Sequence, residues 1–105
     1  MMKMISIPHC RGIRMAQPEE IVRVEASSNY CKIYFSCGSP MLVAKVLMWF
    51  QNQLPEQMFT RVHRRHLINN NFIEQINMAK QTTVMLSNGE IIKMSRRRKA
   101  LLMTG

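Results

Sequence analysis

The clearest absence in this 105-residue sequence is acidic: it contains no aspartate, and its six acidic residues are all glutamates. A metal-dependent nuclease needs clustered carboxylates to hold its ion. The one adjacent pair, Glu19 and Glu20, fits the start of a short helix, where negative charge is favoured. Glycine is also scarce, with four isolated residues, which argues against a glycine-rich phosphate loop. We therefore expect neither an enzyme nor a bound cofactor.

The sequence also lacks long apolar runs and a cysteine framework. No apolar stretch is long enough to span a bilayer, and the N-terminal stretch lacks the apolar core and cleavage site of a signal peptide. The three cysteines, Cys10, Cys31 and Cys37, are an odd number without CxxC spacing, which favours reduced thiols over disulfides. These features predict one cytoplasmic domain over residues 1–105.

Positive charge is what the sequence has in excess. Fifteen Lys and Arg residues give a formal net charge of +9, which solubility does not require and which opposes compaction. A polyanionic partner is the natural reason, with nucleic acid the first candidate and an anionic membrane surface the second. Much of the charge falls in two clusters, RVHRRH at 61–66 and KMSRRRK at 93–99.

The apolar pattern is mostly that of short β-strands, which alternate between two faces. In segment 21–26, Val22, Val24 and Ala26 are expected on one face and Arg23 and Glu25 on the other. In segment 30–36, alternation places Cys31 with the apolar, core-facing side chains. Further strands are expected at 5–7, 13–16, 40–44, 71–76, 82–86 and 90–94, with Asn-Gly at 88–89 marking a hairpin.

After the strand expected at 40–44, the spacing of apolar residues changes from every second residue to a helical period. Apolar residues recur at helical spacing up to Leu54, and Pro55 stops the run, which predicts one short helix over about 45–54. Ser95 is a candidate N-cap for a possible C-terminal helical turn. The fold class is therefore mostly β, a sandwich of short antiparallel strands with one short helix attached.

The two basic clusters follow strands, and loops on a rigid sheet commonly carry binding groups. Arginine is informative, since its planar fork binds phosphate bidentately or reads guanine in the major groove. His63 and His66 have a spacing that could bind a metal, but the flanking arginines would repel the cation, so we expect no metal site. Tyr30 and Tyr34 could stack on bases, although packing on the sheet explains them equally well.

The stretch FTRVHRRHLINNNFIEQI at 59–76 resembles the signature of the LytTR DNA-binding domain, the output module of many bacterial response regulators. Two further stretches resemble other family landmarks, IVRVEASSNYCKIYF at 21–35 and LSNGEIIKMSRRRKALL at 86–102. The resemblance covers about residues 5–102. The positions that match the main signature are Phe59, Arg61, His63, Arg64, Leu67, Ile68, Asn69, Phe72 and Ile73.

The resemblance implies stacked, mostly antiparallel sheets with a short helix, and binding of duplex DNA through three loops that reach successive grooves. The implied base-reading candidates are Arg64, Arg96, Asn29, Tyr30 and Lys32. The phosphate-contact candidates are Arg61, His63, Arg65, Lys93, Arg97 and Arg98. Three positions depart from the family pattern: Arg65 replaces a usual Ser, His66 a usual aromatic residue, and Cys31 a frequent polar residue.

The sequence therefore predicts sequence-specific duplex-DNA binding in bacterial transcription regulation. Two copies are expected on direct repeats, because one such domain covers little DNA. This chain is not expected to contain a receiver domain, so a receiver domain or another regulatory protein is a possible partner. Two alternatives stay open: an RNA-binding basic domain, and a protein-interaction module whose basic face binds an acidic partner.

Overall fold

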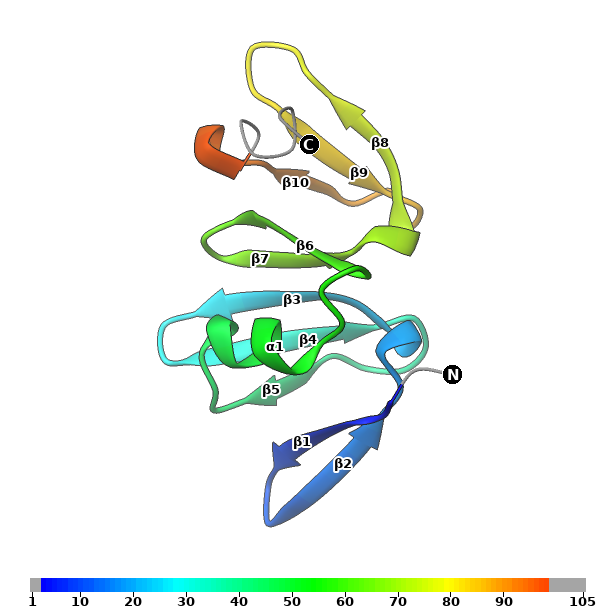
Figure 1. Ribbon diagram of the computed structural model, residues 1–105, viewed down its shortest axis with the longest axis vertical. Coiled ribbons are helices and arrows are strands. Elements are labelled where there is room, and N and C mark those ends of the chain that lie inside the picture. The colour runs from blue at the N-terminus through cyan, green and yellow to red at the C-terminus, as the bar shows by residue number, and fades with distance from the viewer. Residues whose placement is uncertain (1–2, 99–105) are drawn as a thin grey trace.

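The protein is described by a computed structural model of residues 3–98, in which three antiparallel sheets are stacked along the longest axis (Figure 1). The prediction of a mostly β fold with a short helix is confirmed. Within these residues the strands are β1 Ile5–His9, β2 Gly12–Ala16, β3 Ile21–Ser27, β4 Tyr30–Phe35, β5 Met41–Val43, β6 Phe59–His63, β7 His66–Asn69, β8 Ile73–Asn77, β9 Thr83–Leu86 and β10 Ile91–Lys93. Two short 3₁₀ helices, η1 Pro18–Glu20 and η2 Asn70–Phe72, precede β3 and β8.

A five-stranded sheet of order β5-β4-β3-β7-β6 forms the centre of the molecule. One of its faces packs beneath the helix α1 (Leu47–Gln53) and the β1–β2 hairpin, around buried Phe50, Ile33 and Leu67. We call this packing the first core. The other face packs at the β3–β7–β6 end against the sheet β10-β9-β8, the third sheet, and Val62, Ile68 and side chains of β9 form the second core there. Strands β3 and β7 are thus covered on both faces along much of their length, whereas one face of β4 stays partly exposed.

The helix begins later than the sequence predicted. It was expected over about 45–54, whereas α1 spans Leu47–Gln53. The backbone N–H of Lys45 donates to the Val43 carbonyl in a tight turn at 2.8 Å, and Val46 is extended at φ −80°, ψ 161°. The turn that leaves β5 therefore uses the residues that the helical spacing had assigned to the first turn of the helix.

The prediction that Val22 shares a face of β3 with Val24 is wrong. A register shift between Ile21 and Arg23 makes Val22 the extra residue of a β-bulge against β4, and a bulge re-aims its side chain. Val22 consequently lies in the second core, with Ile68 and the β9 side chains, while Val24 lies in the first. Arg23, expected on a polar face, is 5% exposed because the third sheet covers it.

Other local predictions are confirmed. Cys31 faces the first core and is fully buried. The Asn88-Gly89 hairpin joins β9 to β10 through a connection in which Gly89 takes φ +92°, a conformation that glycine adopts without strain. The Ser95 hydroxyl accepts a hydrogen bond from the backbone N–H of Arg98 at 3.2 Å, as an N-cap does. The rest of the possible C-terminal turn lies outside the described residues.

Candidate nucleic-acid interface

Three connections and the ends of the strands beside them carry the predicted binding residues, and all three connections emerge at one edge of the molecule (Figure 1). They are the β3–β4 turn, the β6–β7 turn and the segment 95–98 after β10, which we call the three edge loops. The Ala26 N–H, at the end of β3, donates to the carbonyl of Arg65 in the β6–β7 turn at 2.8 Å. The Ser95 N–H donates to the Val62 carbonyl in β6 at 2.9 Å. The two basic clusters, thirty or so residues apart in sequence, are therefore neighbours in space.

The electrostatics of the β6–β7 turn also join the clusters into one positive surface. Burial lowers the pKa of Arg61, and the charge of Arg98 lowers it further. Burial also lowers the pKa of His63, and the charges of Arg64 and Arg65 lower it further. Each cation near this edge disfavours the next, so an arriving polyanion would relieve repulsion that the folded protein holds in place.

Arg61 is committed to the shape of the β6–β7 turn. Its Nε donates to the His63 carbonyl at 3.2 Å, one terminal nitrogen donates to Gln51 Oε1 at 2.9 Å, and the other donates to the Arg64 carbonyl. The turn has two residues between strands and a register shift in β6, which places Val62 in the core. Arg61 thus fills the inside of the turn and anchors it to α1.

The remaining side chains of the turn face outward. Arg64 is exposed, and its side chain makes no hydrogen bond within residues 3–98. Arg65 is also exposed, and its Nε donates to the Ala26 carbonyl at 3.2 Å. The Arg65 N–H donates to His63 Nδ1 at 3.2 Å, so the proton of the neutral imidazole is on Nε2, where it is available to an acceptor.

The β3–β4 turn presents polar groups around Ser28, whose φ is +56°. The Ser28 hydroxyl donates to Asn29 Oδ1 at 2.7 Å, which leaves the Asn29 amide N–H groups available for acceptors. Tyr30 is exposed and Lys32 half-buried. The centroid of the Tyr34 ring, by contrast, lies 3.8 Å from the guanidinium carbon of Arg23, so Tyr34 is a packing residue.

The third edge loop is less enclosed than the second. Arg96 and Arg97 are exposed, Arg98 is half-buried, and none of the three donates a side-chain hydrogen bond within residues 3–98. Lys93, at the end of β10, is exposed on the same edge and contributes to the lowered pKa of His63. No residue of 3–98 therefore occupies the guanidinium groups of this loop.

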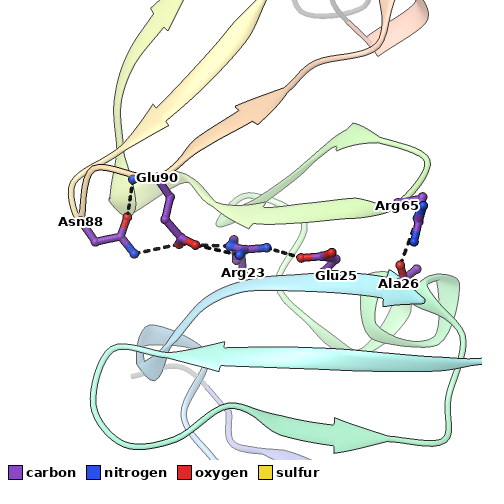
Figure 2. A network of polar contacts seen from close by, with 6 residues as sticks. All are labelled: Arg23, Glu25, Ala26, Arg65, Asn88 and Glu90. Carbon is purple, nitrogen blue, oxygen red and sulfur yellow. Dashed lines mark hydrogen bonds and ion pairs between the residues drawn. The ribbon is translucent and has the colours of Figure 1, made fainter.

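A buried arginine network fixes the third sheet against the central sheet (Figure 2). Arg23 donates to Glu90 through Nε at 3.2 Å and Nη2 at 2.8 Å, and to Glu25 through Nη1 at 2.8 Å. Asn88 also donates to the Glu90 carboxylate at 2.8 Å. Burial alone would lower the pKa of Arg23, but the hydrogen bonds of Glu90 and Glu25 outweigh it and raise the pKa.

Sequence reasoning missed the residues that hold the interface in place. Gln51, in α1, and the Arg23–Glu90 pair carried no signal beyond ordinary surface polarity, because their partners are distant in sequence. Within residues 3–98 no group of three metal-ligating side chains converges. No helix in the described part of the chain is long and apolar enough to cross a membrane.

The fold and the positive edge formed by the three edge loops define the class of protein. It is a β-rich domain that presents three connections to a polyanion. Comparison with known families assigns it further. The profile of the LytTr DNA-binding domain matches residues 11–104, so the chain belongs to this family. The DNA-binding domain predicted from the sequence is confirmed, and an RNA-binding or protein-docking role is not favoured.

A solved structure supports the fold. The chain is similar to the LytTr DNA-binding domain of a protein described as a methyl-accepting/DNA response regulator of Bacillus cereus. The TM-score is 0.79 at 18% identity, and the match covers 96% of this chain and 94% of that one. A comparison with curated protein sequences found no match.

Proposed function

We propose that this domain regulates transcription by binding a specific duplex sequence through the three edge loops. The observation that carries the proposal is their convergence: backbone hydrogen bonds tie the first loop to the second, and the third to β6, at one positive edge. The longest dimension of the domain is 44 Å, against about 34 Å for one helical turn of DNA. Loops spread along that axis can reach successive grooves on one side of a duplex.

The residue roles follow from which donors each loop leaves available. Arg64 and Arg96 are our candidates for reading bases, because both are exposed and have a guanidinium with no partner in residues 3–98. Asn29, Tyr30 and Lys32 are the candidates in the first loop. The phosphate contacts are assigned to His63, Arg65, Lys93, Arg97 and Arg98. The nitrogens of Arg61, the sixth phosphate candidate, donate to two carbonyls at the turn and to Gln51 in α1, so we propose a positioning role for it.

A duplex fits this edge better than a single strand does. Single-strand binders stack bases on exposed aromatic side chains, and here Tyr34 is occupied by Arg23 while Tyr30 alone is exposed near the loops. The donors are mainly guanidinium groups, which suit phosphates and major-groove guanine. We further propose that two copies occupy direct repeats in the cytoplasm, under the control of a receiver domain or another regulatory protein.

Competition binding at matched salt tests the proposal, with duplex DNA, structured RNA and heparin as competitors. Preference among duplex sequences is expected, and selection from random duplexes gives the recognised sequence. If five to eight basic side chains reach phosphates, the slope of log affinity against log salt should be roughly −5 to −7. Ranking by charge density alone, or a slope shallower than about −2, would contradict specific duplex binding.

A further inference from the structure

The β8–β9 turn, residues 78–82, is built against the third edge loop. The Met94 N–H donates to the Thr82 carbonyl at 2.9 Å, and Gln81 Nε2 donates to the Met94 carbonyl at 3.3 Å. Both hydrogen bonds hold Met94, which immediately precedes Ser95. The turn lies beyond the third loop along the longest axis, at the end of the molecule (Figure 1). Its position is therefore fixed relative to that of Arg96.

A cavity of about 280 Å³ opens between the two segments, lined by Lys80, Gln81, Thr82, Met94 and Arg96. Two of these side chains are cations and none is a carboxylate. Lys80 and Arg96 are both exposed, and neither makes an ion pair within the described range 3–98. A hollow with a cation on each side and no acid among its described lining residues is suited to an anion with several acceptor oxygens.

We propose that this cavity binds one backbone phosphate of the duplex, held by Lys80 next to the base pair that Arg96 contacts. The proposal rests on the function proposed above and extends the interface to a fourth connection, the β8–β9 turn. Thr82 and Gln81 position the turn through their bonds to Met94. Lys80 supplies the charge, and the compact ammonium group contacts phosphate without reading sequence.

The test compares Lys80→Gln with Lys3→Gln in the full chain. Both residues are exposed lysines, so each variant loses one positive charge, but Lys3 precedes β1, far from the cavity in the order of the stacked sheets (Figure 1). Lys80→Gln should weaken binding to the selected and random duplexes alike, by roughly two- to fivefold. Its salt slope should be shallower by about one unit, whereas Lys3→Gln should keep the slope of the unmodified protein.

Lys80→Arg should restore both affinity and slope, which a purely structural role of the turn would not predict. Ethylation of single phosphates should interfere with the unmodified protein at one position that no longer matters for Lys80→Gln. Equal slopes for Lys80→Gln and Lys3→Gln, or a loss confined to the selected sequence, would refute the phosphate site while duplex binding itself stands. An unmodified protein that shows no duplex preference would overturn the proposed function, and this site with it.

Discussion

The β6–β7 turn and the segment 95–98 carry similar runs of arginine, yet the structure uses them differently. In the turn, Arg61 donates to two backbone carbonyls and to Gln51, and Arg65 donates to Ala26. In the segment, none of the three arginines donates a side-chain hydrogen bond to any residue of 3–98. A basic run is therefore not one uniform surface, since some of its members shape the loop that presents the others.

The two regions also depend on different supports. The β6–β7 turn belongs to the central sheet itself, whereas the segment 95–98 follows β10, whose sheet is fixed by the second core and by the Arg23–Glu90 pair. The two regions share Val62, whose side chain lies in the second core and whose carbonyl accepts the Ser95 N–H. Changes at Arg61 or at the Arg23–Glu90 pair, which leave Val62 intact, should therefore affect one loop more than the other. The predictions below use this difference, beginning with the largest expected effect.

Arg23→Met should reduce the free energy of unfolding by about 2–3 kcal/mol, because it leaves Glu25 and Glu90 without their partner. This loss is at or below the smallest losses typical of broken buried ion pairs, because both glutamates are about one-third exposed. Arg97→Met is the matched control, an exposed arginine that should change stability by less than about 0.5 kcal/mol. Urea unfolding measures both, and equal stabilities would contradict a structural role for the network.

The same network predicts acid sensitivity. Arg23 lowers the pKa of Glu90 by hydrogen bonding, and it lowers that of Glu25 despite the burial that would raise it. Folded pKa values below the unfolded value of about 4.3 stabilise the protein above that pH. This contribution should be lost as pH falls through the folded pKa values. Between pH 5 and pH 3, Arg23→Met should lose less stability than the unmodified protein does. The difference should be roughly in proportion to the pKa shifts of Glu25 and Glu90 that the substitution removes. Urea unfolding at each pH measures it.

Arg64→Ala and Arg96→Ala should each flatten sequence preference at one base pair, by about 1–3 kcal/mol of discrimination. Nonspecific binding should change little for Arg64→Ala, because this side chain is not assigned to phosphate. It should fall slightly for Arg96→Ala, because Arg96 also lines the proposed phosphate cavity. Measuring affinity across single-base variants of the selected site gives the preference. Arg65→Ala is the control in the same turn and should weaken all duplexes together; identical profiles for Arg64→Ala and Arg65→Ala would refute the division of roles.

Arg61→Gln should lower affinity for the selected site by about 1–2 kcal/mol, because it removes hydrogen bonds that hold the turn. A positioning residue predicts an unchanged salt slope together with weaker preference at the base pair read by Arg64. A phosphate contact predicts the reverse, a slope shallower by about one unit with preference intact. Salt titrations on selected and random duplexes separate the two, and circular dichroism checks that the fold is retained.

Arg98→Ala should weaken selected and random duplexes alike, by a few-fold, with a slope shallower by about one unit. The second loop should be unaffected, so the base preference associated with Arg64 should persist. Loss of that preference in Arg98→Ala would show that the two regions are more strongly coupled than their separate supports indicate.

The smallest effect concerns the cysteines. Burial raises the pKa of Cys31 to about 11, and its side chain is fully buried, so the native protein should label slowly there. Cys10 and Cys37 are exposed and should label faster. Mass spectrometry of partly labelled protein gives the order, and rapid labelling of Cys31 that bound DNA blocks would place it in the interface instead.

The sequence by itself determined the features that rest on local alternation and composition. The period-two pattern of 30–36 placed Cys31 in the core, Ser95 marked a helical N-cap, and the excess of arginine indicated a polyanionic partner. These signals are readable because strand facing, capping and turn chemistry depend on residues a few positions apart. The order of the three matching stretches also sufficed to indicate the family.

Tertiary structure alone decided which arginines serve the fold and which remain exposed on the surface. The pairing of the buried Arg23 depends on Glu90, 67 positions away in sequence. The commitment of Arg61 depends on Gln51 in the helix, and the cavity beside Lys80 depends on two strands that meet only in the third sheet. A guanidinium has the same charge wherever it stands, so its role is set by the carbonyls and carboxylates that the folded chain brings within reach.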